Sequence, residues 1–174
     1  MSNIKMSGRV YNAMMKFANG TSACPQLANM FYSEGRVYAT DSYAAVRWTP
    51  AVEPDFAESF FFSANKKPTA SQQLYISAET CDIDIESIAP KNMDKLFEEP
   101  NFAAMRGENR VPAINPTYLA DIAALGKAVK CDKCGSDGST VLEWKNDTLI
   151  AHIYAGANGR FDVVVAPCFI NKID

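Results

Sequence analysis

The amino-acid sequence predicts a two-layer α+β domain in which two helices cover one face of an antiparallel sheet. Two stretches have the 3.6-residue periodicity of amphipathic helices, and each is followed by short runs of β-forming residues separated by turn signals. A helix with one apolar stripe must bury it, and an apolar sheet face provides the surface. The order helix, strands, helix, strands therefore predicts a duplicated unit of two similar halves.

The size of the chain is that of one domain. Its 174 residues, 48% hydrophobic, can form one well-buried core and are few for two ordinary domains. We expect a single domain over residues 1–174, with a first half at about 1–50, an acidic connector at about 51–110 and a second half at about 111–174.

The composition indicates the compartment. No apolar run approaches the roughly 20 residues of a membrane span, and the start of the chain lacks the apolar stretch of a signal peptide. Five irregularly spaced cysteines do not form a disulfide pattern. We therefore expect a cytoplasmic protein with reduced thiols and no membrane partner.

The charge is unevenly distributed along the chain, although the formal net charge is only −3. Residues 1–50 contain five Lys and Arg against two Asp and Glu, a balance of +3, whereas residues 51–100 contain four against ten, a balance of −6. Residues 101–174 contain eight of each. A basic face on an acidic body is compatible with this distribution.

The first half begins with a predicted helix over residues 8–19. Ser7 is a suitable N-cap, and Asn19-Gly20 is a stop signal. Residues 26–32 and 36–48 are rich in β-forming residues and are separated by a short turn, which predicts a hairpin.

The middle of the chain is less regular. The aromatic run 60–62 lies between prolines and predicts a short buried strand, with stacking on single-stranded DNA or anchoring of a protein partner as alternatives. Residues 74–85 alternate as a strand does, whereas 87–110 combine two prolines, many charges and little periodicity. That last stretch is interpreted as a connector.

The second half begins with a helix predicted over residues 115–129. Asn115 can cap it, and Pro116 suits its first turn. A glycine-rich loop follows, and Asn146-Asp147 and Asn158-Gly159 are turn signals. They delimit three expected strands: 140–145, 148–155 and 161–170.

Four stretches of the chain, residues 39–46, 85–95, 114–121 and 163–170, together resemble the bacterial DNA polymerase III β sliding clamp. The first resembles the family's Ala-Thr-Asp-Gly motif, but Ser42 replaces its glycine and Ala44 its arginine, so any role of that arginine is absent here. The others resemble an interdomain segment, the helix start of the last clamp domain and its closing strand. The four stretches occur in the same order as in the family.

The resemblance implies a fold and a role. Sliding clamps encircle duplex DNA as a ring of about six such domains, with helices lining the hole and sheets facing outward. It implies a non-catalytic DNA-binding tether or processivity factor in replication, with duplex DNA, replication proteins and further copies of the chain as partners. One domain cannot close around a duplex, so several copies assemble or this relative no longer encircles DNA. The short chain suggests a phage or mobile-element protein.

The candidate DNA-binding residues are basic side chains of the two helices. Arg9 and Lys16 are seven residues apart, which places both on the polar arc of the first helix. Such a pair can neutralise phosphates without reading bases, although a solvated helix face has the same composition. Lys5, Lys127 and Lys130 are weaker candidates for the same surface.

A second hypothesis assigns function to the acidic segment. Asp82, Asp84 and Glu86 alternate along a predicted strand and share one of its faces. They would form a DNA-mimicking surface in a clamp-fold interaction module, such as a phage-type inhibitor of a host replication or defence protein. A solvated acidic edge is the alternative interpretation.

No pattern in the chain predicts an enzyme, a metal or a cofactor. Cys131 and Cys134 have the spacing of half a zinc site, but two more ligands would have to come from distant residues, so we expect free thiols. His152, the only histidine, lies in a predicted strand with no nucleophile motif beside it.

Overall fold

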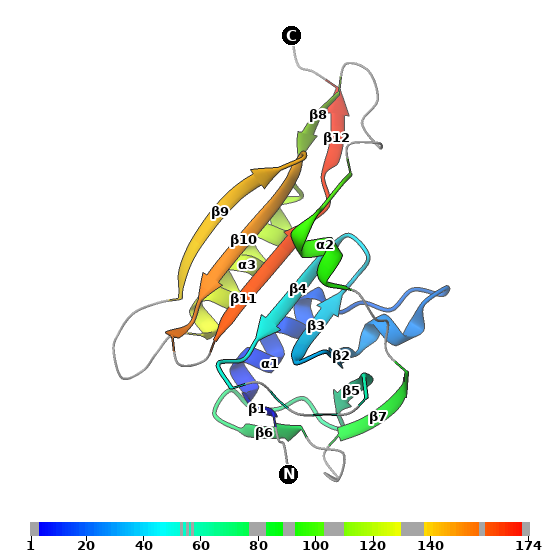
Figure 1. Ribbon diagram of the computed structural model, residues 1–174, viewed down its shortest axis with the longest axis vertical. Helices are drawn as coiled ribbons and strands as arrows, with labels where there is room; N and C mark the ends of the chain where they lie inside the picture. The colour runs from blue at the N-terminus through cyan, green and yellow to red at the C-terminus, as the bar shows by residue number, and fades with distance from the viewer. Residues whose placement is uncertain are drawn as a thin grey trace.

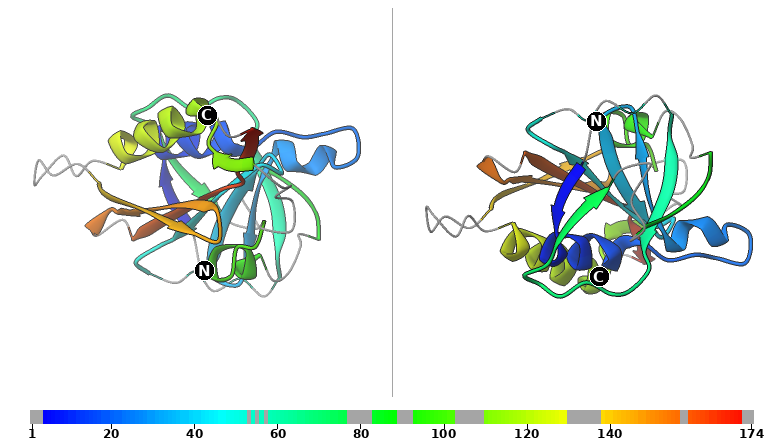
Figure 2. Two further views of the ribbon diagram at one scale, coloured as in Figure 1. Left: turned by 90° about the horizontal axis from the view of Figure 1, so that it is seen from above. Right: turned by 90° about the horizontal axis from the view of Figure 1, so that it is seen from below.

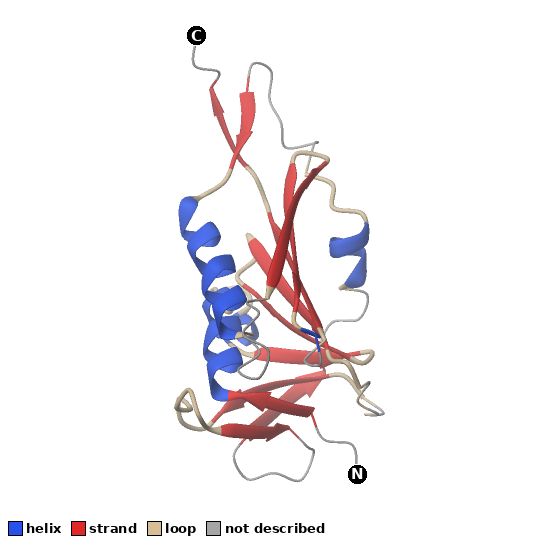
Figure 3. Ribbon diagram, turned by 90° about the vertical axis from the view of Figure 1, so that its left-hand side faces the viewer, coloured by secondary structure: helices blue, strands red, loops and turns tan. Residues whose placement is uncertain are grey.

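Two helices lie side by side on one face of a large antiparallel sheet. The computed structural model describes residues 4–52, 54, 56, 58–76, 83–88, 93–102, 110–129, 138–156 and 159–171. Helices α1 (Gly8–Met14) and α3 (Pro116–Ala128) cover one face, and the short α2 (Asp94–Glu98) lies on the other (Figures 1, 2 and 3). The predicted two-layer α+β fold, with both long helices on the same side, is confirmed.

The large sheet has eight strands within the described residues, in the order β7-β5-β2-β3-β4-β11-β10-β9. All neighbouring strands are antiparallel. Their bounds are β2 Met30–Ser33, β3 Arg36–Thr40, β4 Ala44–Thr49, β5 Phe60–Ala64, β7 Ile83–Ile88, β9 Ser139–Lys145, β10 Thr148–Tyr154 and β11 Arg160–Val165. Two smaller antiparallel pairs join β1 (Ile4–Ser7) to β6 (Gln73–Ile76) and β8 (Arg110–Ala113) to β12 (Cys168–Asn171).

The element order repeats. The series β1-α1-β2-β3-β4 in the first half corresponds to β8-α3-β9-β10-β11 in the second. The last strands of the two meanders, β4 and β11, pair with each other, with Val46 opposite Val163. This pairing joins the halves into one sheet and confirms the predicted duplicated architecture.

Both predicted N-caps are present. The Ser7 hydroxyl accepts a hydrogen bond from the Val10 backbone amide at 3.3 Å, and the Asn115 side chain accepts one from the Thr117 amide at 3.0 Å. Each satisfies an amide that the first helical turn leaves without a partner. Pro116, at the first helical position, has no amide to satisfy.

The first helix is shorter than predicted. After α1 the chain tightens into a 3₁₀ turn, η1 (Met15–Phe17), and Ala18 is already extended, with φ −95° and ψ 119°. The Asn19 amide then donates to the Thr40 carbonyl, so the backbone leaves the helix to meet the sheet. The buried Phe17 side chain lies at this exit.

Two predicted strands are each divided in the structure. Residues 36–48 form β3 and β4 because the Asp41 carboxylate accepts hydrogen bonds from the amides of Tyr43 and Ala44, at 2.9 and 2.7 Å, which makes a turn. Residues 161–170 form β11 and β12, separated at Pro167, which cannot donate to a ladder.

Three further predictions in the first two thirds of the chain need correction. The run 26–32 is helical at its start, where Pro25–Ala28 form a 3₁₀ turn, and the strand begins only at Met30. Residues 74–85 contribute to two strands of different sheets, β6 and β7. The stretch 87–110, predicted as a connector, contains α2 and the start of β8.

The two-residue turns are those that the sequence predicts. Glu34 and Gly35 both have positive φ, 48° and 81°, and so do Asn146 and Asp147, at 49° and 63°. Two successive positive values are typical of the type I′ turn, whose twist matches that of a hairpin. Asn158 lies outside the described residues, and Gly159 has φ 88°.

The core lies between the helix pair and the sheet. Met14, Phe17 and Leu125 from the helical layer are fully buried there, as is Phe62 from β5, which confirms the buried-strand interpretation of 60–62. A smaller cluster on the opposite face packs Phe97 of α2 against residues such as Phe31 and Tyr38. None of the helices in the described ranges is long and apolar enough to cross a membrane.

Candidate nucleic-acid interface

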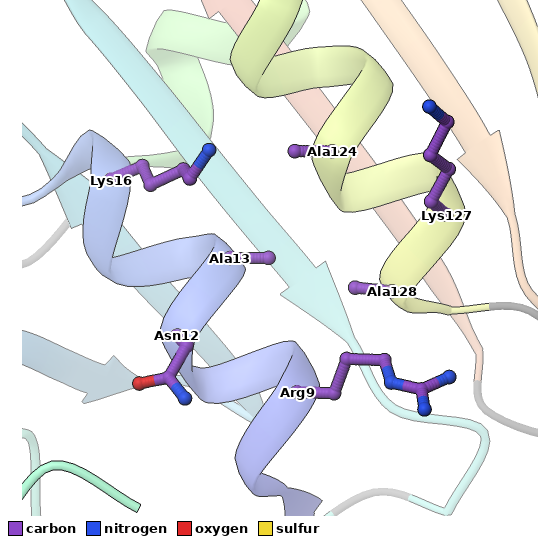
Figure 4. A pocket seen from close by; sticks show the side chains of 7 residues that line it. All are labelled: Arg9, Asn12, Ala13, Lys16, Ala124, Lys127 and Ala128. Carbon is purple, nitrogen blue, oxygen red and sulfur yellow. The ribbon is translucent and has the colours of Figure 1, made fainter. Parts of the chain in front are cut away.

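A groove of about 460 Å³ runs between α1 and α3 on the outer surface of the helical layer. Its lining consists of three cations, three alanines and one asparagine from α1, η1 and α3 (Figure 4). The lining residues are Arg9, Asn12, Ala13, Lys16, Ala124, Lys127 and Ala128.

The helical spacing of small residues creates the groove. Ala13 on α1 faces Ala124 and Ala128 on α3, and the last two are four residues apart, one above the other on one helix face (Figure 4). A methyl side chain fills little of the space between two helices, so a depression remains. The longer basic side chains stand at its borders.

The structure brings three of the five predicted DNA-binding residues together. Arg9 and Lys16 extend from the α1–η1 segment toward α3, and Lys127 comes from α3 (Figure 4). Lys5 is exposed on β1 but does not line the groove, because β1 pairs with β6 below the helices. Lys130 lies outside the described residues.

The three groove cations differ in their ionic partners. Among the described residues, none forms an ion pair with Arg9 or Lys127, and both side chains are in exposed positions. The Lys16 Nζ atom instead lies 3.3 Å from Asp121 Oδ1 of α3. The groove therefore presents two cations without an ionic partner among the described residues and a third whose charge is shared with an acid.

Sequence reasoning missed Asn12 and Asp121. Asn12 belongs to the same polar arc as Arg9, and its amide donates to the Pro68 carbonyl at 2.8 Å, which fixes the loop beside the helix. Asp121 precedes Ala124 by three residues and Ala128 by seven, a spacing that places it on the face of α3 directed at α1. That spacing is the feature of the sequence that could have predicted the position of Asp121.

The residues of the alternative hypothesis lie elsewhere. Asp84 and Glu86 belong to β7, an edge strand of the large sheet, where they pair with Ser63 and Phe61 of β5. Asp82 lies outside the described residues, as do Cys131 and Cys134. Within the described part of the chain, no group of three or more His, Cys, Asp or Glu side chains could hold a metal ion.

An ionic network occupies the sheet face opposite the groove. The Asp162 carboxylate, 3% exposed, accepts hydrogen bonds from Arg47 Nη2 at 2.9 Å and Arg160 Nε at 2.6 Å, and His152 Nδ1 lies 2.7 Å from it. Burial alone would raise the pKa of Asp162, but the hydrogen bonds from His152, Arg47 and Arg160 outweigh burial and hold this pKa below its ordinary value.

The same network fastens α2 to the sheet. Arg47 Nη1 lies 2.8 Å from Asp94 Oδ1, and Arg36 pairs with the other oxygen of that carboxylate. The Tyr38 hydroxyl donates to Asp94 at 2.8 Å, and burial raises the pKa of Tyr38 to about 12, so it remains a donor. Because the Arg47 guanidinium also lies 4.6 Å from the centre of the Phe97 ring, α2 is held by both charge and packing. His152 belongs to the same network through its contact with Asp162.

Comparison with solved structures finds matches of low sequence identity and low TM-score. A protein described as a DNA polymerase III beta subunit from Eubacterium rectale is 11% identical, with a TM-score of 0.36, over 99% of this chain and 52% of that chain. Two structures from Pseudomonas aeruginosa, a DNA polymerase sliding clamp with ligand and a DNA polymerase III beta subunit, are 10% and 11% identical, with TM-scores of 0.34 and 0.31. These two matches extend over 98% and 99% of this chain, respectively, and over 52% of each matched chain.

This chain therefore spans about half the length of those solved chains. No protein-family model matches the sequence, and no curated protein is significantly similar to it.

Proposed function

We propose that the chain is a single, non-catalytic clamp-like domain that binds duplex DNA through the groove between α1 and α3 and acts as a tether or processivity factor in replication. The observation that carries this proposal is the convergence of Arg9, Lys16 and Lys127 on one groove from two helices far apart in the sequence. The role would place the protein in the cytoplasm with replication proteins as further partners.

The spacing of the cations favours a polymer of phosphates over a single anion. Arg9 and Lys16 are separated by seven residues of the α1–η1 segment, on the order of 10 Å along its axis. Cations that are spread along the groove in this way can contact successive phosphates of a nucleic-acid backbone. Neutralisation of several phosphates releases counterions and gives affinity that falls with salt.

The groove offers little for reading bases. Its lining contains three alanines, and the amide group of Asn12, the polar uncharged side chain there, already donates to Pro68. Contacts from Lys and Arg to phosphates position a protein without carrying sequence information. The resemblance of the sequence to sliding clamps suggests duplex DNA as the polymer, bound without sequence preference.

A titration of labelled duplex DNA tests this proposal. Two duplexes of unrelated sequence should bind equally, with a Kd of about 10⁻⁴ to 10⁻⁶ M near physiological salt, as is typical of non-specific binding. The affinity should fall as salt rises, because the contacts are ionic. Absence of duplex binding even at low salt would contradict the proposal.

We further propose that copies of the chain associate through the edge strand β9. All seven residues of β9 are exposed, and Val141, Leu142 and Trp144 are 52%, 54% and 56% exposed. An exposed apolar edge strand can pair with another strand. Because one domain covers only part of the circumference of a duplex, a ring would need several copies joined by one repeated interface.

Replacing Leu142 and Trp144 by lysine should shift the protein toward the monomer, because charged side chains oppose edge pairing. Sedimentation over a range of protein concentrations measures the shift. The monomer's stability should change little, since both side chains are half exposed, and urea unfolding provides that control. A wild-type protein that is strictly monomeric at high concentration would overturn self-association while leaving the groove proposal to the DNA titration.

The acidic-segment hypothesis remains a second candidate because β7, which contains Asp84 and Glu86, is an edge strand of the sheet that the described residues form. A host replication or defence protein would bind this edge through basic residues. Neutralising the two acids as Asp84→Asn and Glu86→Gln would then abolish capture of the partner and leave duplex binding unchanged. Under the DNA proposal the same substitutions have no effect on function.

A further inference from the structure

We infer that Asp121 competes with DNA phosphates for Lys16, so that an internal ion pair limits the affinity of the groove. The inference rests on the proposed function and concerns its regulation by a residue inside the helical layer. It starts from the asymmetry among the groove cations, of which only Lys16 has an ionic partner among the described residues.

The geometry places the acid beneath the cation. The Lys16 side chain is 48% exposed and lines the groove, whereas the Asp121 side chain is 14% exposed and does not line it. The separation of 3.3 Å between Nζ and Oδ1 is a direct contact. The ammonium group can therefore meet a phosphate from the open side while its inner side remains against the carboxylate.

The charges around Lys16 determine how strongly it can bind a phosphate. The groove cations sum to +3, and Asp121 reduces the local sum to +2. A phosphate that approaches Lys16 also approaches the Asp121 carboxylate, and the like charges repel. Lys16 therefore contributes less to phosphate binding than Arg9 or Lys127.

The carboxylate also links the two helices, so its charge and its packing must be separated. Asp121→Asn removes the charge and keeps the size and a hydrogen-bonding oxygen. Asp121→Glu keeps the charge and should behave as the wild type does. Glu98→Gln, on the exposed side of α2 across the sheet, removes one negative charge far from the groove and serves as the matched control.

The test is the salt dependence of binding to a labelled duplex of mixed sequence. Asp121→Asn should raise affinity several-fold at low salt and steepen the plot of log affinity against log salt by up to about 0.9, the value for one more phosphate contact. Glu98→Gln and Asp121→Glu should leave the slope at the wild-type value. Urea unfolding of each variant confirms that it is folded.

The same comparison of Asp121 with Asn, made in a Lys16→Gln background, tests whether Lys16 is the cation that loss of the Asp121 charge frees for phosphate binding. In that background Asp121→Asn should not steepen the slope, because no further cation becomes available. An unchanged slope for Asp121→Asn in the wild-type background, or an equal steepening without Lys16, would overturn the inference. If neither the wild type nor any variant binds duplex at low salt, the proposed function itself fails, which is a different result.

Discussion

Replacing Asp162 by alanine is expected to lower the free energy of unfolding by about 3–5 kcal/mol, the cost typical of removing one partner from a buried ion pair. The Asp162 side chain is 3% exposed and the Arg47 side chain 11%, so the substitution leaves a guanidinium group with a charge that water hardly reaches. Asp162 also positions the Arg47 side chain that pairs with Asp94, so the attachment of α2 should weaken at the same time. Urea unfolding measures the loss.

Arg160→Gln is the matched control within the same network. Arg160 contacts the same carboxylate at 2.6 Å but is 44% exposed, so water can replace the hydrogen bond that the carboxylate loses when Arg160 is substituted. Its removal should cost less than about 1 kcal/mol, as for other exposed pairs. An Asp162→Ala protein no less stable than Arg160→Gln would show that the network does not stabilise the fold.

The contribution of Asp162 should depend on pH in a direction fixed by its pKa. Hydrogen bonds from His152, Arg47 and Arg160 outweigh burial and lower this pKa in the folded protein. The stabilisation is therefore fully present above the ordinary aspartate pKa of about 4 and is lost as pH falls through the lower, folded value. The stability difference between wild type and Asp162→Asn should be constant near neutrality and shrink only in strong acid.

Reversing two groove cations, as Arg9→Glu with Lys127→Glu, should abolish measurable duplex binding near physiological salt. The change replaces two positive charges by two negative ones at the phosphate positions and should reduce binding equally for unrelated duplex sequences. These two cations are the suitable choice because neither has an ionic partner among the described residues. A glutamate at position 16 would instead face Asp121 and could disturb the helix pair.

The double reversal also separates the two functional hypotheses. If the acidic edge at β7 is the functional surface, the substitutions leave capture of a protein partner intact, and there is no duplex affinity to lose. Equal duplex binding by wild type and double variant at every salt concentration would show that DNA contacts another part of the surface. Unfolding curves of the two proteins exclude a loss of fold as the cause.

Local signals in the sequence predicted much of the fold. The caps at Ser7 and Asn115 and the turns at 34–35 and 146–147 each depend on residues within three positions of one another. The missed turn at 41–43 is also local, but it depends on one Asp41 carboxylate accepting from two amides inside an otherwise β-forming run. Periodicity does not detect such a turn.

Long-range contacts account for what the sequence could not predict. The position of α2 depends on Asp94, which pairs with Arg36 and Arg47 from distant strands. In the candidate site, helical spacing placed Arg9 and Lys16 on one arc, and Lys127 was expected on the same surface. Which residues line the groove beside them follows from the packing of α3 beside α1, which local spacing does not determine.

The salt dependence of duplex binding by Lys127→Gln, compared with Lys95→Gln, tests the central claim most directly. Lys127 lines the groove, whereas Lys95 is exposed on α2 across the sheet, and each substitution removes one positive charge. If DNA lies along α1 and α3, Lys127→Gln should reduce the slope of log affinity against log salt by about 0.9, and Lys95→Gln should leave it unchanged. Equal slopes for the two variants would contradict a DNA-binding groove between the helices.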